Sequence, residues 1–180
     1  MRVIAGQAKG TRLSRPPGGT RPLSDRAREG LFAALASTVV DARCLDLFAG
    51  TGAVGIEALS RGAAHCVFVD SGPQAIRTIR ENLSRTGFGE RGEVVRAEAG
   101  RFMRRPSGPY DLAFVDPPYA VPPAWLAGVL TALVSRLRGN ATFVLTRGPR
   151  SSTDVIPLHF GVVRRLIYGD TLVLVCREEA

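Results

Sequence analysis

Short apolar segments of strand length alternate with longer segments of helical periodicity through the central part of the chain. The apolar segments lie at residues 44–48, 66–69, 94–95, 112–115 and 141–146. Between the second and the third, Ile76, Ile79 and Leu83 recur at helical spacing in a segment that begins near Pro73 and ends near Gly87. Continuous apolar strands separated by amphipathic helices are typical of a parallel sheet that helices cover on both faces.

The same spacing predicts two further helices. One covers residues 53–61 and ends at Gly62. The other carries apolar residues from Leu126 to Leu137 and is closed by Gly139. Helices of this length between the apolar segments allow each strand to return parallel to the one before it.

The last part of the chain has a different pattern. Apolar runs at 162–167 and 172–175 flank Tyr168-Gly169-Asp170, which predicts a β-hairpin. Such a hairpin adds an antiparallel strand to the end of an otherwise parallel sheet. The pattern therefore predicts an α/β fold with a seven-stranded, mostly parallel sheet and a C-terminal antiparallel hairpin.

The amino-terminal segment is predicted to be a short β-hairpin that precedes this domain. Runs at 3–5 and 11–13 flank two glycines, and the segment Arg15-Pro16-Pro17-Gly18-Gly19 excludes regular structure after them. Ser24 then has the side chain of a helix N-cap. We therefore expect a hairpin extension at 1–22 and one domain at 23–180. We also expect removal of the first 20 residues to leave the parallel sheet intact.

Composition places the chain among ordinary globular proteins, but its charge is unevenly distributed. The 180 residues are 45% hydrophobic and 22% charged, which excludes disordered and fibrous classes. The net charge is +8, and seven basic against two acidic residues give +5 within residues 1–30. A basic arm on a nearly neutral body indicates a polyanion partner, with a solvated arginine-rich face as the alternative. The candidates for phosphate contacts are Lys9, Arg12, Arg15, Arg21 and Arg26.

The sequence argues against several classes of site and location. No apolar run approaches the length of a membrane span, and the first ten residues lack the apolar core of a signal peptide, so a cytoplasmic protein without membrane contact is predicted. Cys44, Cys66 and Cys176 lie in apolar runs without metal-binding spacing. We therefore expect reduced, buried thiols and no metal site.

A glycine-rich loop follows the first strand of the predicted sheet. Gly50, Gly52 and Gly55 satisfy the GxGxxG pattern, and Asp70 lies 20 residues after Gly50 at the end of the second strand. This arrangement fits a dinucleotide-binding fingerprint, so an NAD-dependent oxidoreductase is one alternative. Asp46 argues against it, because a carboxylate before the loop repels a pyrophosphate. The same carboxylate suits the ammonium group of an amino acid.

The sequence Asp116-Pro117-Pro118-Tyr119 ends the fourth strand, at the sheet edge where open α/β folds bind ligands. The Asp116 carboxylate and the Pro117 carbonyl can accept both N–H groups of an exocyclic base amine and so localise its lone pair. The two prolines stiffen the loop, and the Tyr119 ring offers a face for stacking a base. Methylation at carbon 5 of cytosine needs a cysteine nucleophile, which residues 116–119 lack.

In order along the chain, these features resemble known methyltransferases. LDLFAGTGAVGIEAL, Asp70 and DPPY resemble the S-adenosylmethionine-dependent enzymes that modify amino groups. RVIAGQAKGTRL, RPLSDRAREGLFAAL, CLDLFAGTGAVGIEALSRGA, FVDPPY and the C-terminal hairpin resemble the bacterial 16S ribosomal RNA guanine-N2 methyltransferases over essentially all of the chain. The resemblance implies a Rossmann-like class I methyltransferase fold and a monomeric enzyme. It further implies S-adenosylmethionine as the methyl donor and an assembled small-subunit particle as the substrate.

The site residues expected on this basis form two groups. The cofactor is expected to contact Asp46, Phe48, Gly50, Thr51, Gly52 and Gly55 around its methionine and ribose, Asp70 at the ribose hydroxyls, Ser71, Glu98 and Ala99 at the adenine, and Ser24 at the methionine carboxylate. The catalytic residues are expected to be Asp116, Pro117, Pro118 and Tyr119. Ser24, Val69-Asp70 and Glu98 depart mildly from the usual residues of the family.

An amino-directed DNA methyltransferase, acting on adenine N6 or cytosine N4, is the main alternative to the RNA enzyme. The DPPY chemistry serves either polymer. An extension of some thirty residues is, however, too small for a base-reading DNA domain, whereas shape and phosphate recognition of folded RNA suits a small basic arm.

Overall fold

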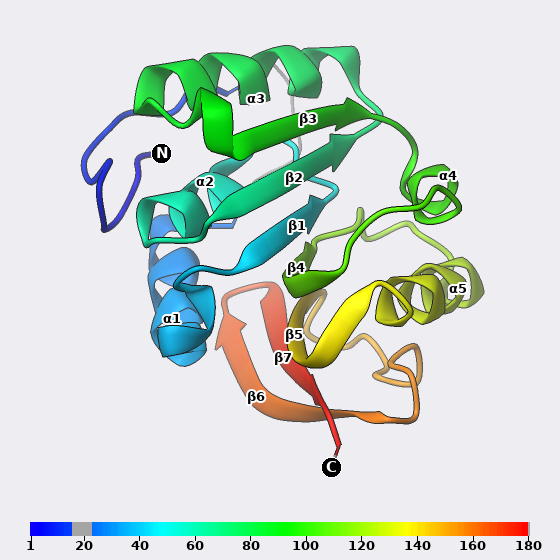
Figure 1. Ribbon diagram of the computed structural model, residues 1–180. Coiled ribbons are helices and arrows are strands. Elements are labelled where there is room, and N and C mark those ends of the chain that lie inside the picture. The colour runs from blue at the N-terminus through cyan, green and yellow to red at the C-terminus, as the bar shows by residue number, and fades with distance from the viewer. Residues whose placement is uncertain (16–22, 180) are drawn as a thin grey trace.

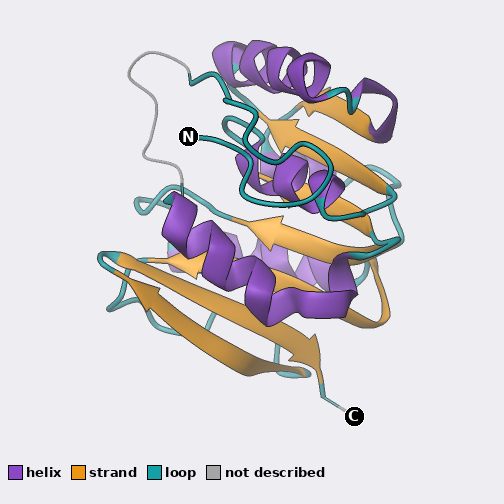
Figure 2. Ribbon diagram, turned by 90° about the vertical axis from the view of Figure 1, so that its left-hand side faces the viewer, coloured by secondary structure: helices purple, strands orange, loops and turns teal. Residues whose placement is uncertain are grey.

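The computed structural model describes residues 1–15 and 23–179 and contains a seven-stranded sheet in the order β3-β2-β1-β4-β5-β7-β6 (Figure 1). The strands are β1 (Arg43–Leu47), β2 (His65–Asp70), β3 (Gly92–Arg96), β4 (Tyr110–Val115), β5 (Leu137–Arg147), β6 (Phe160–Tyr168) and β7 (Thr171–Glu178). The pairs from β3 to β5 are parallel. β7 pairs antiparallel with both β5 and β6. Figure 2 shows this C-terminal hairpin as two long strands at one edge of the sheet. The predicted fold is confirmed.

Helices cover both faces of the sheet. They are α1 (Asp25–Leu35), α2 (Ala53–Ser60), α3 (Pro73–Thr86), α4 (Ala99–Met103) and α5 (Pro123–Val134), with 3-10 turns at Ala36–Val39 and Gly89–Arg91. α1, α2 and α3 pack with one side of the central strands, including Cys44 and Phe68. α4 and α5 pack with the other side, including Leu45 and Val67. The alternation of side chains along each strand therefore divides the core into two layers.

One predicted boundary is wrong. The helical spacing from Leu126 was expected to continue to Leu137 and to end at Gly139, but α5 ends at Val134. Leu137 already pairs with Tyr110 as the first residue of β5, and the register shifts before Leu112. Leu137, the first residue of β5, happens to fit the helical spacing of α5. Periodicity alone therefore cannot locate the end of this helix.

The first 15 residues, here called the N-terminal arm, pack against α2 and α3 (Figure 1). The predicted hairpin is present as a single antiparallel bridge between Arg2 and Arg12. Val3 and Leu13 are buried in the core layer of α1 to α3. The arm is therefore packed into the domain.

Buried polar side chains of the domain hold the backbone of the arm. The carboxylate of Glu57, which is fully buried, accepts the N–H groups of Ile4 and Ala5 at 2.8 and 3.1 Å. The amide of Asn82, also fully buried, bonds Ser14 twice, at 2.7 and 3.1 Å. The structure argues against the expectation that the first 20 residues can be removed without loss to the fold, because removal takes away the arm's hydrogen bonds to these buried groups.

Within the described residues, no helix is both long enough and apolar enough to cross a bilayer.

Candidate active site

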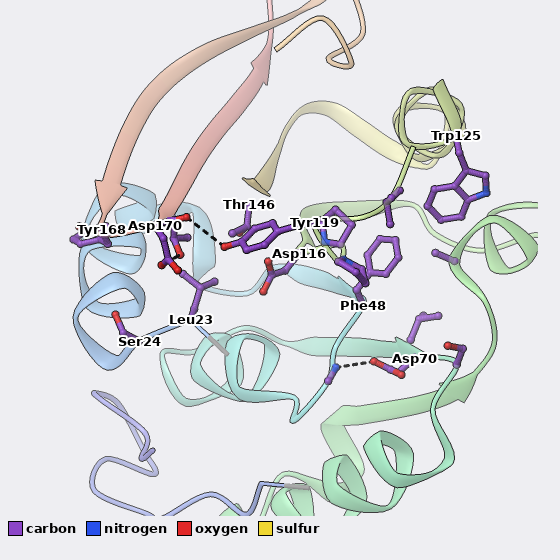
Figure 3. Close-up of a pocket in the computed structure, with 18 of the residues that line it drawn as sticks. Leu23, Ser24, Phe48, Asp70, Asp116, Tyr119, Trp125, Thr146, Tyr168 and Asp170 are labelled. Atoms are coloured by element: carbon purple, nitrogen blue, oxygen red, sulfur yellow. Dashed lines mark hydrogen bonds between the residues drawn. The ribbon is translucent and has the colours of Figure 1, made fainter. Parts of the chain in front are cut away.

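A cavity of about 1240 Å³ lies at the carboxyl edge of the sheet (Figure 3). Its wall includes residues that directly follow β1, β2 and β4, among them Phe48, Ser71 and Asp116. Pockets for a single small ligand usually measure roughly 300–1,000 Å³. The cavity is therefore large enough for two ligands side by side.

The glycine loop between β1 and α2 has the backbone that the GxGxxG pattern requires. Gly50 and Gly52 have φ angles of 55° and 75°, which favour glycine. A Cβ on Gly55 would lie 2.4 Å from the Phe68 ring, so only glycine lets α2 approach β2 this closely. Phe48 also has a positive φ, 78°, and is therefore a strained residue in the cavity wall.

Asp70 ties the glycine loop to the end of β2. One carboxylate oxygen accepts the Gly50 N–H at 2.9 Å (Figure 3), and the other accepts the Gly72 N–H at 2.8 Å. Each oxygen of a carboxylate has a second lone-pair site. Asp70 therefore lines the cavity in a fixed orientation and retains acceptor capacity for ligand hydroxyls.

Asp46 lies behind the cavity wall. Its carboxylate is 3% exposed and accepts the Gly55 N–H at 3.0 Å. Burial raises the pKa of Asp46 to about 7; the Gly55 hydrogen bond opposes this rise, and the charges of Asp116 and Asp70 add to it. The carboxylate thus faces α2, and it is not one of the groups that line the cavity.

Ser24 and Glu98 both line the cavity and both cap helices. The Ser24 hydroxyl accepts the Ala27 N–H at 3.1 Å, which confirms its predicted N-cap role and leaves its proton free to donate. The Glu98 carboxylate accepts the N–H groups of Gly100 and Arg101 at 2.8 and 2.9 Å. Figure 3 places Ser24 on the side of Tyr168, well away from Asp70.

The Asp116–Tyr119 loop crosses the middle of the cavity, and Asp116 lies between Asp70 on one side and Asp170 on the other (Figure 3). Burial raises the pKa of Asp116 to about 6. Tyr119 is 62% exposed, and its hydroxyl donates to the backbone oxygen of Asp170 at 3.4 Å. Within the described residues neither the Asp116 carboxylate nor the Pro117 carbonyl accepts a hydrogen bond, so both are available to a ligand.

Comparison with known proteins identifies the family. The family model described as "Conserved hypothetical protein 95" matches residues 1–177. The chain belongs to this family. A relative from Escherichia coli (strain K12), named ribosomal RNA small subunit methyltransferase D, is 32% identical over 187 residues, which cover 100% of this chain and 91% of the relative. The family inferred from the sequence is thereby confirmed.

Solved structures agree with this family. The structure of yhhF from Escherichia coli is 32% identical and superposes with a TM-score of 0.89 over 100% of this chain and 98% of that one. The hypothetical protein TTHA0928 from Thermus thermophilus is also 32% identical, with a TM-score of 0.83 over 97% and 98% of the two chains. The fold of the family is that of the class I methyltransferases.

The structure brings most of the expected site residues of this family member to one cavity. Those that line it are Ser24, Arg26, Phe48, Gly50, Asp70, Ser71, Glu98, Ala99, Asp116, Pro117, Pro118 and Tyr119. Asp46, Thr51, Gly52 and Gly55 lie in or behind the glycine loop and do not line it. Lys9, Arg12 and Arg15 are exposed on the N-terminal arm, and Arg21 lies outside the described residues.

Other residues of the cavity wall were not assigned to the site from the sequence. Trp125, at the start of α5, lies edge-on to Phe48 with ring centroids 6.2 Å apart. Thr146 comes from the end of β5, and residues 167–171 come from the β6–β7 turn. The closeness of the β6–β7 turn to the Asp116–Tyr119 loop depends on the sheet order, in which β7 lies next to β5, and no local pattern in the sequence records it.

Proposed function

We propose that this protein transfers a methyl group from S-adenosylmethionine to the exocyclic N2 amine of a guanine in 16S ribosomal RNA. The observation that carries the proposal is the position of the Asp116–Tyr119 loop in the middle of a cavity with room for two ligands. The cofactor half of this cavity comprises Phe48, Gly50, Asp70, Ser71, Glu98 and Ala99. The acceptor half comprises Leu23, Tyr119, Thr146 and residues 167–171.

The cofactor half fits S-adenosylmethionine. Asp70 retains lone pairs that can accept the two ribose hydroxyls, and Glu98 and Ala99 line the same half of the cavity, where we expect them to contact the adenine amine. A Cβ on Gly50 would meet no atom within 4 Å, so the loop leaves open space beside it. The aromatic pair of Phe48 and Trp125 adds an apolar wall. When bound, the cofactor supplies an electrophilic methyl group on a sulfonium.

The residues between the halves hold and orient the amine. The Asp116 carboxylate and the Pro117 carbonyl accept its two N–H groups, which directs the lone pair toward the methyl donor. The amine loses one proton after the transfer, and a carboxylate with a pKa of about 6 can accept it. Tyr119 stacks on the base, which must leave its helix or loop stack to reach the cavity.

The N-terminal arm and the names of relatives support ribosomal RNA as the polymer. Lys9, Arg12 and Arg15 are exposed, as binding to RNA phosphates requires. Arg26 is exposed and also lines the cavity, so it is placed to contact a phosphate near the target base. We propose that a monomer of this protein in the cytoplasm binds an assembled small-subunit particle in this way.

The other candidate functions have less support. No observation favours DNA as the polymer over ribosomal RNA, although the same loop could position adenine N6 or cytosine N4. The NAD-dependent oxidoreductase is wrong, because the family and its solved structures are those of methyltransferases.

Transfer of tritium from labelled S-adenosylmethionine tests the proposal. The substrates are small-subunit particles from cells that lack this protein, naked 16S RNA and duplex DNA, and each product is digested to nucleosides. We expect label in N2-methylguanosine from the particles. Label in DNA, or in any other nucleoside, would overturn the proposed target.

A further inference from the structure

The acceptor half of the cavity ends at the tight turn between β6 and β7. Tyr168 pairs with Thr171, so Gly169 and Asp170 form a two-residue hairpin loop. Gly169 has a φ of 60°, whereas Asp170 is not among the residues with positive φ. Glycine at the first of two loop positions is typical of a type II′ turn. This geometry places Asp170 at the tip, in the cavity wall.

Two contacts hold this turn in position. On one side, Tyr168 packs on α1 at Gly30, where an added Cβ would lie 1.7 Å from the Tyr168 hydroxyl oxygen. On the other side, the Tyr119 hydroxyl donates to the backbone oxygen of Asp170 (Figure 3). The turn therefore packs closely on α1, and its tip makes one long hydrogen bond to the loop that carries Asp116.

The carboxylate of Asp170 has unused acceptor capacity. Its only side-chain hydrogen bond within the described residues is a long one, 3.4 Å, from the Thr171 hydroxyl. None of the ion pairs between described residues includes it. Its side chain lies on the opposite side of Asp116 from Asp70, on the side left for the acceptor base (Figure 3).

We propose that Asp170 selects guanine by accepting the N1–H of the target base while Asp116 accepts the adjacent N2 amine. This inference rests on the proposed function and names its specificity-determining residue. An N–H next to an exocyclic amine occurs on the pairing edge of guanine alone. Adenine and cytosine present an unprotonated ring nitrogen beside their amine, which the Asp170 carboxylate repels. Uracil has a ring N–H but no amine.

The rigidity of the turn gives this selection its strength. Asp170 is exposed in the free protein, so its selectivity arises once a bound base covers the carboxylate. A covered acceptor discriminates strongly against an analogue without the N–H, because the analogue leaves the acceptor unpaired and out of contact with water. If the turn were free to move, the carboxylate would retreat into solvent at little cost. The contacts at Gly30 and Tyr119 restrict that movement.

Base analogues at the target position test this assignment. After the methylated guanine has been located, particles are reconstituted with 16S RNA that carries guanine, 2-aminopurine or inosine there. 2-Aminopurine keeps the amine but has an unprotonated N1, whereas inosine keeps the N1–H and lacks the amine. For the wild type we expect transfer to guanine at least about 100-fold faster than to 2-aminopurine, and none to inosine.

The variant Asp170→Asn reverses the hydrogen-bonding character of the residue, because its amide can donate to an unprotonated N1. We expect the preference for guanine over 2-aminopurine to fall at least about tenfold, the scale of one hydrogen bond to a base edge. Affinity for S-adenosylmethionine should stay within twofold. Asp154→Asn, an exposed acidic position that does not line the cavity, is the matched control and should keep the wild-type preference.

The two levels of the proposal fail in different ways. If the wild type labels no guanine in the particle, the proposed function is wrong. If it labels guanine but Asp170→Asn keeps the wild-type preference over 2-aminopurine, the proposed function stands and the role of Asp170 is overturned.

Discussion

The two halves of the cavity are built in opposite ways. In the cofactor half, the carboxylates of Asp70 and Glu98 each accept two backbone N–H groups at 2.8–2.9 Å. In the acceptor half, Asp170 has one long side-chain hydrogen bond, and Tyr119 is held by a single 3.4 Å hydrogen bond. Asp116, between the halves, has no hydrogen-bond partner within the described residues. Backbone N–H groups of the protein therefore orient the carboxylates of the cofactor half. The polar side chains of the acceptor half keep free positions for hydrogen bonds to a ligand.

This difference predicts that cofactor affinity and turnover depend on different residues. A half whose polar groups are already paired can bind a ligand without rearrangement, which favours affinity. The Asp116 carboxylate accepts no hydrogen bond from the described residues, so it is positioned for a group that arrives with the acceptor. Substitutions in the two halves should therefore affect different measured quantities.

The largest effect is expected at the boundary between the halves. Asp116→Ala should lower turnover by about 10²–10³-fold, the usual loss for one preorganised group at a reacting centre. Affinity for S-adenosylmethionine, measured by calorimetry, should remain nearly normal. Tyr119→Ala should behave in the same direction with a smaller loss. Wild-type turnover in Asp116→Ala would contradict the mechanism.

The next prediction tests whether the N-terminal arm stabilises the glycine loop of the cofactor half. The Asn82 amide donates to the backbone oxygen of Thr51 in the glycine loop at 3.0 Å while it holds Ser14 of the arm. Deletion of residues 1–14 should lower the free energy of unfolding by about 3 kcal/mol or more, since Val3 and Leu13 lose their burial. Urea unfolding measures this loss, and cofactor affinity should fall with it.

The matched control keeps the arm and removes its charge. Arg12→Gln with Arg15→Gln changes only exposed side chains and should leave unfolding unchanged. RNA-particle affinity should weaken, and its salt dependence should become shallower by about 0.7–0.9 log units per log of salt for each phosphate that is no longer neutralised. An unchanged salt dependence would assign RNA binding to the loops around the cavity instead.

A smaller effect is expected within the cofactor half itself. Asp70→Ala removes an oriented acceptor for the ribose hydroxyls and should weaken S-adenosylmethionine binding about tenfold. Because the methyl acceptor does not contact Asp70, turnover at saturating cofactor should change little. Calorimetry and steady-state kinetics separate the two. Cofactor affinity within twofold of the wild type would remove Asp70 from the site.

The smallest effect is a dependence on pH. Asp116 must be ionised to accept both the hydrogen bond and the proton, and its pKa is raised to about 6. Turnover should therefore fall as the pH falls, to about half at pH 6 and about a tenth at pH 5. Asp46, whose pKa is raised to about 7, titrates nearby, so Asp46→Asn is the control and should keep the same profile. A flat profile from pH 8 to 5 would show that Asp116 does not titrate in the rate-determining step.

The parts of the site that could be predicted from the sequence are those that depend on local structure. The glycine loop, the Ser24 cap and the end of α3 at Gly87, which has a φ of 76°, follow from backbone requirements within a few residues. The contact of Tyr119 with Asp170 joins residues 51 apart and depends on the order of β5, β7 and β6. The sequence pattern did not predict α4, because a helix of five residues is too short to show a periodic pattern.

The hydrogen bonds that hold the N-terminal arm can form only late in the synthesis of the chain. The side chains that hold the arm, Glu57, Ser60 and Asn82, follow the backbone groups they bond by 52 to 68 residues. The arm is made first, yet its partners emerge only after β1, α2 and most of α3 have been translated. Val3 and Leu13 pack in the core layer of α1 to α3, so they gain that packing only after the middle of the domain has been made.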